Sequence, residues 1–247
     1  MSPFKTLTVS LARTNLRDPA TMFFSYVFPP VMLVVLARSM RDFPGTNGHA
    51  IVNDISPNVL GFGIAFVGMF AGAMNIAEWR EKGVVRLLRC APMSTSSILG
   101  SALTVALASA IVQTLLVTAV GLVPYVGVEL SPWAPLSVVP VFLGTLMFYS
   151  LGVLVGLVVP TLSAASLVVM LIVMPMGVGA GAMMPLEVLP SWVQTLSRFL
   201  PMTYLLEGVR WPFTGVVDFQ HAALGWLVMA VTGGALFAAS IKLMRWR

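Results

Sequence analysis

Long apolar stretches follow one another along most of this chain, and short polar segments separate them. Six of them approach or exceed the roughly 20 mostly apolar residues that a membrane-spanning helix needs. These stretches are residues 21–37, 56–77, 98–123, 134–159, 163–183 and 222–242. The pattern predicts an all-α, polytopic membrane protein with six transmembrane helices. We expect one membrane domain over residues 1–247, in which residues 21–77 hold spans one and two and residues 98–183 hold spans three to five.

The polar segments differ in charge according to the side of the membrane on which they would lie. With residues 1–20 inside, the segments 78–97 and 160–162 and the tail that ends residues 222–247 fall on the same side. These inside segments hold ten cations and three acids, a net charge of +7, whereas the outer segments hold four cations and six acids, a net −2. Cytoplasmic loops carry an excess of Lys and Arg. We therefore expect an inner (plasma) membrane protein with both termini in the cytoplasm.

The first segment has a helical pattern of its own. On a 3.6-residue period one face is apolar and the opposite face is basic, although Val9 and Leu16 interrupt the pattern. The apolar face carries Phe4, Leu7 and Leu11, and the opposite face carries Arg13 and Arg17. This arrangement predicts an amphipathic helix within residues 1–20 that lies on the cytoplasmic leaflet. A solvated basic tail is the alternative.

The outer segment 184–221 is too apolar for a plain loop. Two stretches of helical pattern, each about ten residues long, cover 189–201 and 202–211, and Pro190, Pro201 and Pro212 start or stop them. Such stretches are too short to cross a bilayer. We expect a pair of short outer re-entrant or interfacial helices.

Composition removes several classes of function. The 247 residues are 58% hydrophobic and only 9% charged, against about 25% charged in a soluble domain. None of the three lysines follows a glycine, so no phosphate-binding loop is present. His49 and His221 both fall in outer segments, and Cys90 alone cannot build a thiolate metal site. We expect no catalytic residue, no metal site, no cofactor bound by this chain and no nucleic-acid partner.

The apolar stretches also lack the groups that an ion-coupled pump needs. Their interiors hold essentially no ionisable side chain, and such residues usually mark proton or ion pathways. Only Asn75 and Gln113 are strongly polar, and each is expected to form a hydrogen bond between helices. A gradient-driven carrier or channel is therefore disfavoured, and the energy for transport has to come from outside the chain.

Two further patterns concern packing. Phe62, Phe66, Phe70 and Met74 recur every fourth residue on the second span, where they could line a greasy cavity or simply face lipid or a neighbour. Pairs of glycines at helical spacing let two helix backbones approach closely, within one chain or between two chains. The pairs are Gly68/Gly72, Gly152/Gly156 and Gly177/Gly181.

The segment 78–97 is the one strongly charged part of the chain. Six charged residues lie within residues 78–89. Glu78 and Lys82 form a favourable pair four residues apart, and Arg86 and Arg89 lie one helical turn from each other. Pro92 ends the helical pattern. A basic loop held on anionic lipid headgroups is the simpler interpretation, and a docking helix for another protein is the sharper one.

A family resemblance favours the second interpretation. Residues 78–94, EWREKGVVRLLRCAPMS, resemble the Glu-Arg-x-x-Gly-Thr-x-x-x-Leu-x-x-x-Pro-Leu/Val-Ser segment of type-2 permeases of ATP-binding-cassette (ABC) transporters. The basic amphipathic start, the six spans and the Leu-Pro-x-Trp…Leu-Pro-x-Thr-Tyr element at 189–204 are similar as well. The match departs at Trp79, where a second arginine is common, and at Val84, where threonine is usual.

The resemblance implies a set of roles for these segments. Residues 1–20 become an elbow helix, and residues 78–97 become a cytoplasmic coupling helix that docks on a separate ABC ATPase subunit, which would hold ATP and Mg. A second permease copy or a homologous permease would complete a path through the membrane, lined by spans one, two and five. The docking residues would be Glu78, Arg80, Glu81, Lys82, Arg86, Leu87 and Arg89. The substrate path would include Phe62, Phe66, Phe70, Met74, Asn75, Met170 and Met174.

The cargo follows less directly from the resemblance. An exporter of a hydrophobic or amphipathic compound, such as a drug, an antibiotic or a lipid-like molecule, is the leading hypothesis, and the methionine content mildly favours it. A polysaccharide or lipid-linked glycan exporter shares the architecture. An accessory or assembly subunit without a transport path of its own also fits the sequence.

Overall fold

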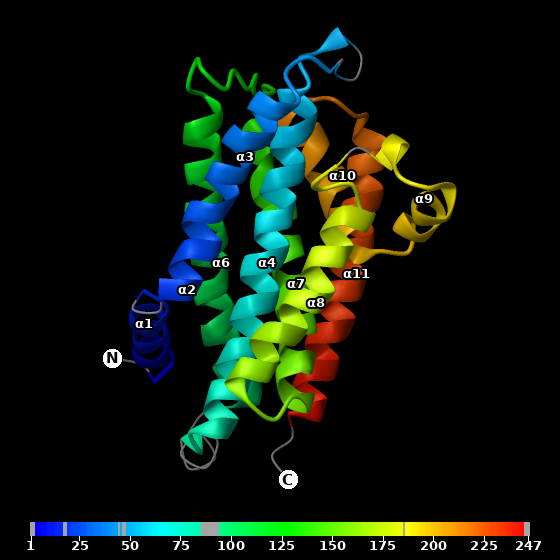
Figure 1. Cartoon of the computed structure of the whole chain (residues 1–247). Coiled ribbons are helices and arrows are strands. Elements are labelled where there is room, and N and C mark those ends of the chain that lie inside the picture. Colours follow the sequence, from blue (N-terminus) through cyan, green and yellow to red (C-terminus); the bar gives the residue numbers. More distant parts are fainter. Residues whose placement is uncertain are drawn as a thin grey trace.

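The chain is a bundle of helices (Figure 1). Its structure, a computed structural model, describes residues 3–16, 19–43, 45, 48–84, 94–184 and 186–244. In chain order the helices are α1 (Pro3–Asn15), α2 (Pro19–Met22), η1 (Phe23–Val27), α3 (Phe28–Ser39), α4 (Val52–Glu81), α6 (Thr95–Gly121), η3 (Ala134–Ser137), α7 (Val138–Val158), α8 (Leu162–Gly179), η4 (Leu186–Val188), α9 (Ser191–Ser197), α10 (Pro201–Thr214) and α11 (Phe219–Leu243). Every one of these elements is a helix, which confirms the all-α prediction.

Five helices of the described residues are long and apolar enough to cross a membrane. They are α4, α6, η3 with α7, α8 and α11. These helices coincide with the second to sixth predicted spans. The first predicted span falls on Phe23–Ser39, an apolar helix that is shorter than the other five. It begins with the π-helical turn η1, and Pro29 and Pro30 lie in the first turn of α3 that follows.

The helix α4 forms the centre of the bundle. In its most apolar 18-residue window 89% of the residues are buried, whereas the same measure is 22% for α8 and for α11. It packs against α7 through glycines: a Cβ on Gly72 would lie 2.2 Å from the Tyr149 carbonyl oxygen, and one on Gly152 would lie 2.1 Å from that of Met69. The pairs Gly68/Gly72 and Gly152/Gly156 therefore serve packing within the chain.

The third glycine pair has a different use. Gly177 faces the ring of Phe62, where an added Cβ would lie 2.6 Å from a ring carbon. Gly181 lies beyond the end of α8 at a φ of +81°, in the left-handed region that favours glycine. Gly177 and Gly181 thus do not form a helix-packing pair.

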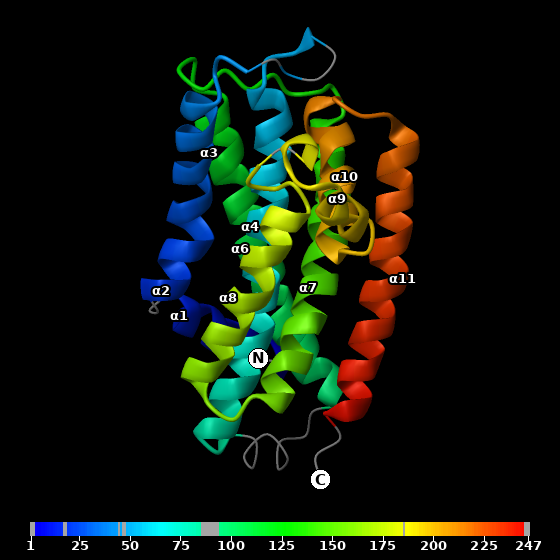
Figure 2. The same ribbon diagram turned by 45° about the vertical axis from the view of Figure 1, so that its right-hand side comes forward.

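The bundle has two distinct ends (Figures 1 and 2). One end, called the charged end below, holds the last turns of α4 and α11 and the α7–α8 connector (residues 159–161), with α1 beside it. The opposite end holds the α3–α4, α6–α7 and α10–α11 connections. The described parts of the segments that were predicted to lie on one side of the membrane therefore share one end of the bundle.

The first helix packs along α6. Leu11 is buried and Leu7 half-buried in a cluster with residues of α6, and Phe4 approaches Gly100. Arg13 is exposed. The predicted apolar and basic faces are thus both present in α1, while Arg17 lies outside the described residues.

The two short helices of segment 184–221 appear as α9 and α10, with different limits from those expected. Pro201 begins α10 as predicted, but Pro212 lies inside it, and the helix continues to Thr214. Proline cannot donate to the carbonyl four residues earlier, here that of Gly208. The indole N–H of Trp226 in α11 donates to this carbonyl instead, at 2.9 Å. A partner from another helix thus lets α10 run through the proline.

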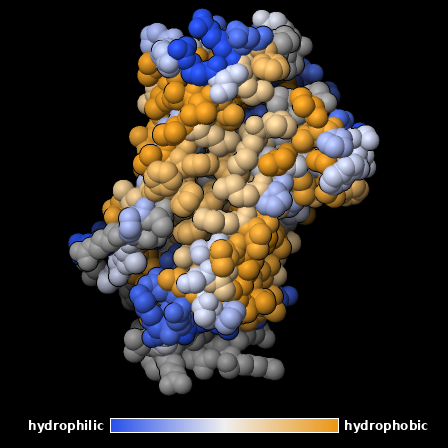
Figure 3. All heavy atoms as spheres, in the orientation of Figure 1, coloured by the Kyte–Doolittle hydropathy of each residue, from blue (hydrophilic) through white to orange (hydrophobic). Residues whose placement is uncertain are grey.

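The surface separates by polarity. Figure 3 shows hydrophobic residues across the middle of the bundle and hydrophilic residues gathered at its two ends. Large apolar side chains are exposed along η1 and α3, where Phe23, Val27, Val31 and Val35 follow one another at four-residue spacing. A soluble protein rarely exposes so much contiguous apolar surface. The arrangement is that of a multi-pass protein embedded in a membrane.

Candidate functional site

The buried central helix α4 ends in a charged turn. Glu78 and Lys82 form an ion pair, with the Lys82 Nζ 2.6 Å from Oε1 of Glu78. This hydrogen bond raises the pKa of Lys82. The pair predicted from four-residue spacing is confirmed. Both partners lie on one helical turn, and the Lys82 side chain is largely exposed.

Arg80 points from the same turn toward the end of α7. Its Nη1 donates to the backbone carbonyls of Gly156 at 3.0 Å, Leu157 at 2.5 Å and Val159 at 3.2 Å. The last carbonyls of a helix have no amide partner within that helix and form the negative end of its dipole. A guanidinium group matches both properties. Arg80 therefore caps α7 from a neighbouring helix.

Glu81 makes the complementary contact with α8. Its Oε2 accepts from the backbone amide of Leu162 at 2.7 Å. Leu162 is the first residue of α8, and Thr161 caps the same end by accepting from the amide of Ala164 at 3.2 Å. The positive end of a helix dipole favours a carboxylate. Arg80 and Glu81 thus hold the two sides of the α7–α8 connector.

This arrangement differs from what the charge pattern alone suggests. Arg80 and Glu81 belong to the predicted ATPase-docking set, yet the structure places the Arg80 side chain on the end of α7 and the Glu81 side chain on the start of α8. The contacts join residues 76 to 81 positions apart, so no local spacing could have indicated them. Arg86, Leu87 and Arg89 lie outside the described residues, and docking through the whole set stays a prediction.

The aromatic stripe of α4 faces another helix of the same chain. Phe62, Phe66 and Phe70 are at most 4% exposed. Phe66 stacks on Phe70 and on Phe24 of η1, with 5.4 Å between ring centroids in each case, and Phe62 lies 6.4 Å from Phe28 of α3. These ring contacts with η1 and α3 cover the aromatic stripe. A substrate path along it stays a prediction, and it would require α3 to separate from α4.

The remaining residues of the predicted path are spread over two places. Phe70, Met74 and Asn75 border a cavity of about 20 Å³ between α1, η1, α4 and α6, which has room for about one water molecule. Met170 and Met174 are half-buried on α8. The structure brings Met74 and Asn75 together with Phe70, but it does not join them to the two methionines of α8.

Gln113 contradicts the expectation of an interhelical hydrogen bond. It is fully buried in α6 against Gly63 of α4, whose added Cβ would lie 2.0 Å from the Gln113 Nε2. Neither amide atom of Gln113 has a hydrogen-bond partner among the described residues. The prediction was wrong because the facing position is a glycine, which offers no side chain to pair with the amide.

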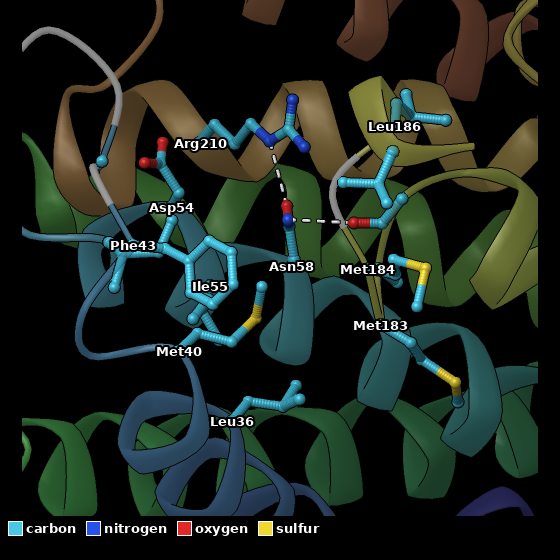
Figure 4. Close-up of a pocket in the computed structure, with 15 residues that line it drawn as sticks. Leu36, Met40, Phe43, Asp54, Ile55, Asn58, Met183, Met184, Leu186 and Arg210 are labelled. Atoms are coloured by element: carbon cyan, nitrogen blue, oxygen red, sulfur yellow. Dashed lines mark hydrogen bonds between the residues drawn. The ribbon is translucent and has the colours of Figure 1, made fainter.

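A larger cavity lies near the opposite end of the bundle, and sequence analysis did not identify it (Figure 4). This distal cavity has a volume of about 390 Å³ and is bordered mostly by apolar side chains. Its lining includes Leu36, Met40, Asp54, Ile55, Asn58, Met183, Met184, Leu186 and Arg210. Because these residues come from four distant parts of the chain, no sequence motif joins them.

One polar side chain organises the wall of the distal cavity. Asn58 donates from Nδ2 to the Gly181 carbonyl at 3.1 Å, and its Oδ1 accepts from the Nε of Arg210 at 2.9 Å. Asn58 thereby joins α4 to the chain after α8 and to α10. Apolar walls with a few placed polar groups are typical of sites that bind small molecules. The cavity has the chemistry to hold an amphipathic molecule.

Comparison with known proteins places these features in a family. Residues 3–214 match the family described as "ABC-2 type transporter". A relative, the "Putative transport permease ycf38" of Cyanophora paradoxa, is 26% identical over 209 residues, which cover 80% of this chain and 69% of that protein. The family match includes α1, the charged turn of α4, the distal cavity and α10.

Proposed function

Because this chain belongs to the ABC-2 type transporter family and is therefore a transmembrane permease subunit of an ABC transporter, we propose that it exports a hydrophobic or amphipathic compound. A separate ABC ATPase subunit supplies the energy. The permease is a transport component and is not itself catalytic. The observation that carries the proposal is the charged turn at 78–82. This turn ends the buried central helix α4, a basic stretch of sequence follows it, and both lie within the family match.

The proposed membrane arrangement has six spans. The helical residues from Pro19 to Ser39, α2, η1 and α3 in succession, form the first span, and α1 is an elbow helix on the cytoplasmic leaflet. The charged end of the bundle faces the cytoplasm, which places both termini there. Its support is the net charge of +7 on the segments of that side, against −2 on the others.

The proposed complex contains more than this chain. The ATPase subunit binds residues 78–97 as a coupling helix and holds ATP and Mg. A second copy of the permease, or a homologous permease, completes the path and gives twelve spans. When the ATPase subunits close on ATP, they push the coupling helices, the spans tilt, and the path opens to the outside.

The proposed cargo is a hydrophobic or amphipathic compound. The distal cavity supports this choice, because apolar side chains, three methionines among them, form most of its wall and Arg210 and Asn58 supply a polar edge. Methionine adapts to ligands of varied shape. A glycan would require a wall rich in hydrogen-bonding groups, and glycan export is the alternative that the cargo experiment tests.

The docking proposal is tested by purification through a tag on this chain from native membranes. We expect an ABC ATPase subunit to co-purify with the wild type and to be lost from the Arg86→Glu, Arg89→Glu variant. Lys242→Glu, a charge reversal at the exposed end of α11, is the control and should retain the ATPase. Absence of an ATPase from the wild-type preparation, or its full retention in the double variant, would contradict docking at this segment.

The cargo is tested on the same complex in liposomes. We expect lipophilic compounds to stimulate ATP hydrolysis and soluble oligosaccharides to leave it unchanged. A flat response to every lipophilic compound, or stimulation by the oligosaccharides alone, would overturn export of a greasy compound while leaving the family assignment in place.

A further inference from the structure

Two adjacent side chains join three helices at the charged end. Arg80 binds three carbonyls at the end of α7, and Glu81 binds the first amide of α8. Both residues belong to the last turn of α4. The two side chains have opposite charges, and each is opposite in sign to the helix end that it contacts. Arg80 meets the negative end of α7, and Glu81 meets the positive end of α8. Together they fix the α7–α8 connector to α4.

The other charged pair of the same turn makes its contact within the turn, as far as the described residues show. Lys82 pairs with Glu78, four residues earlier in the chain, and its side chain is 65% exposed. The four charged side chains of this turn therefore fall into two pairs with different contacts. Arg80 and Glu81 face two neighbouring helices, whereas Glu78 and Lys82 form a pair on the turn itself.

The helix that Glu81 contacts, α8, packs on α4 along one stripe, which includes Ala165, Val169, Val173 and Gly177. Only 22% of the most apolar window of α8 is buried, so most of this helix is open to its surroundings. At its far end α8 leads directly into Gly181, Ala182, Met183 and Met184, which line the distal cavity. A movement of the start of α8 would therefore reach the wall of that cavity through one continuous helix, which carries Pro175 near its far end.

We propose that Arg80 and Glu81 are positioning residues that make the charged ends of α4, α7 and α8 move as one unit when the ATPase acts on residues 78–97. This inference rests on the proposed function, since the ATPase supplies the movement. Without the two contacts, the α7–α8 connector could move relative to α4. The two residues thus carry the movement of the coupling segment into α8 and onward to the distal cavity.

The test measures whether α4 and α8 keep their separation during the ATP cycle. In a Cys90→Ser background, spin labels are placed at Val84→Cys, a half-buried position just after α4 and outside the predicted docking set, and at Ser163→Cys, an exposed position on α8. Double electron–electron resonance then gives the label distance in the complete complex with its native ATPase, without nucleotide and after trapping with ATP and vanadate. We expect one narrow distance that is the same in both states.

The variants separate this role from docking. In Arg80→Ala with Glu81→Ala we expect a broader distance distribution whose mean shifts on trapping, while the ATPase subunit remains bound. Each single alanine variant should show the same change in smaller degree, so the test survives if the double variant does not fold. Arg80→Lys with Glu81→Gln retains a cationic donor and an acceptor and should restore the narrow distance. Lys242→Gln, a charge removal at the exposed end of α11 and outside the predicted docking set, is the control and should behave as the wild type.

Three results would overturn the inference. A wild-type distance that changes on trapping would show that α4 and α8 move separately. Alanine variants that keep the narrow distance, or that lose the ATPase subunit with an unchanged distance, would assign Arg80 and Glu81 to docking or to no role. A wild-type chain that purifies without any ATPase would remove the proposed function, and this inference with it.

Discussion

At the scale of single residues, the contact between α4 and α7 depends on the absence of side chains. An added Cβ on Gly152 would lie 2.1 Å from the Met69 carbonyl oxygen and 3.0 Å from the Ala73 backbone nitrogen. Both atoms belong to the backbone of α4 and cannot rotate away. The central helix and α7 can therefore keep their present separation only while this position remains glycine.

We expect Gly152→Ala to lower the free energy of unfolding by about 1–3 kcal/mol, the usual cost of overpacking a tight interior. Gly234→Ala on α11 is the matched control, because an added Cβ there meets no atom within 4 Å. Thermal unfolding of both variants in the same detergent is the measurement. Equal melting temperatures for the two variants would show that α7 shifts without cost.

Single residues also show where sequence analysis succeeds and where it fails. The Glu78–Lys82 pair was predictable because both partners lie on one turn, and the spacing alone brings them together. Arg80 and Glu81 carry charges of the same kinds, yet their partners are the backbone groups of helices that begin or end some 80 residues later. No side-chain pattern encodes a backbone partner, so these contacts required the structure.

At the scale of helices, apolar length predicted six spans, and five of them are helices long and apolar enough to cross a membrane. Length is informative because a helix in lipid must satisfy its own backbone groups over the full thickness of the membrane. The limits of α10 were less predictable. Sequence analysis ended this helix at Pro212, since proline removes one hydrogen bond of the helix. The bond that replaces it comes from Trp226, on a different helix. Tertiary contacts of this kind decide where short helices end.

We expect Trp226→Phe to cost about 1–3 kcal/mol, because the Gly208 carbonyl would lose its partner while an aromatic ring is retained. In a Pro212→Ala background the new amide of residue 212 can donate to the same carbonyl, so the cost of Trp226→Phe should fall. Unfolding measurements on the four proteins of this cycle give the coupling. An identical cost in both backgrounds would mean that the indole bond contributes nothing to α10.

At the scale of the whole molecule, the two ends of the bundle differ in what they bring together. The charged end joins three helices through Arg80 and Glu81, and the opposite end encloses the distal cavity through Asn58 and Arg210. The order of the spans predicted which segments share an end, because the loops of a polytopic protein must alternate between two sides. It could not predict the cavity, whose wall combines α3, α4, α10 and the chain after α8.

The orientation of the bundle is open to a direct test. Single cysteines in a Cys90→Ser background report which side each end faces, and the chosen positions are all exposed: Lys5→Cys, Lys82→Cys and Lys242→Cys at the charged end, and Pro132→Cys and Asp218→Cys at the opposite end. Because positive loops stay in the cytoplasm, a membrane-impermeant maleimide on intact cells should label only the last two. Permeabilised cells should show labelling of all five, which controls for accessibility. Labelling of the first three in intact cells would reverse the orientation, and the ATPase could then not reach the segment after α4.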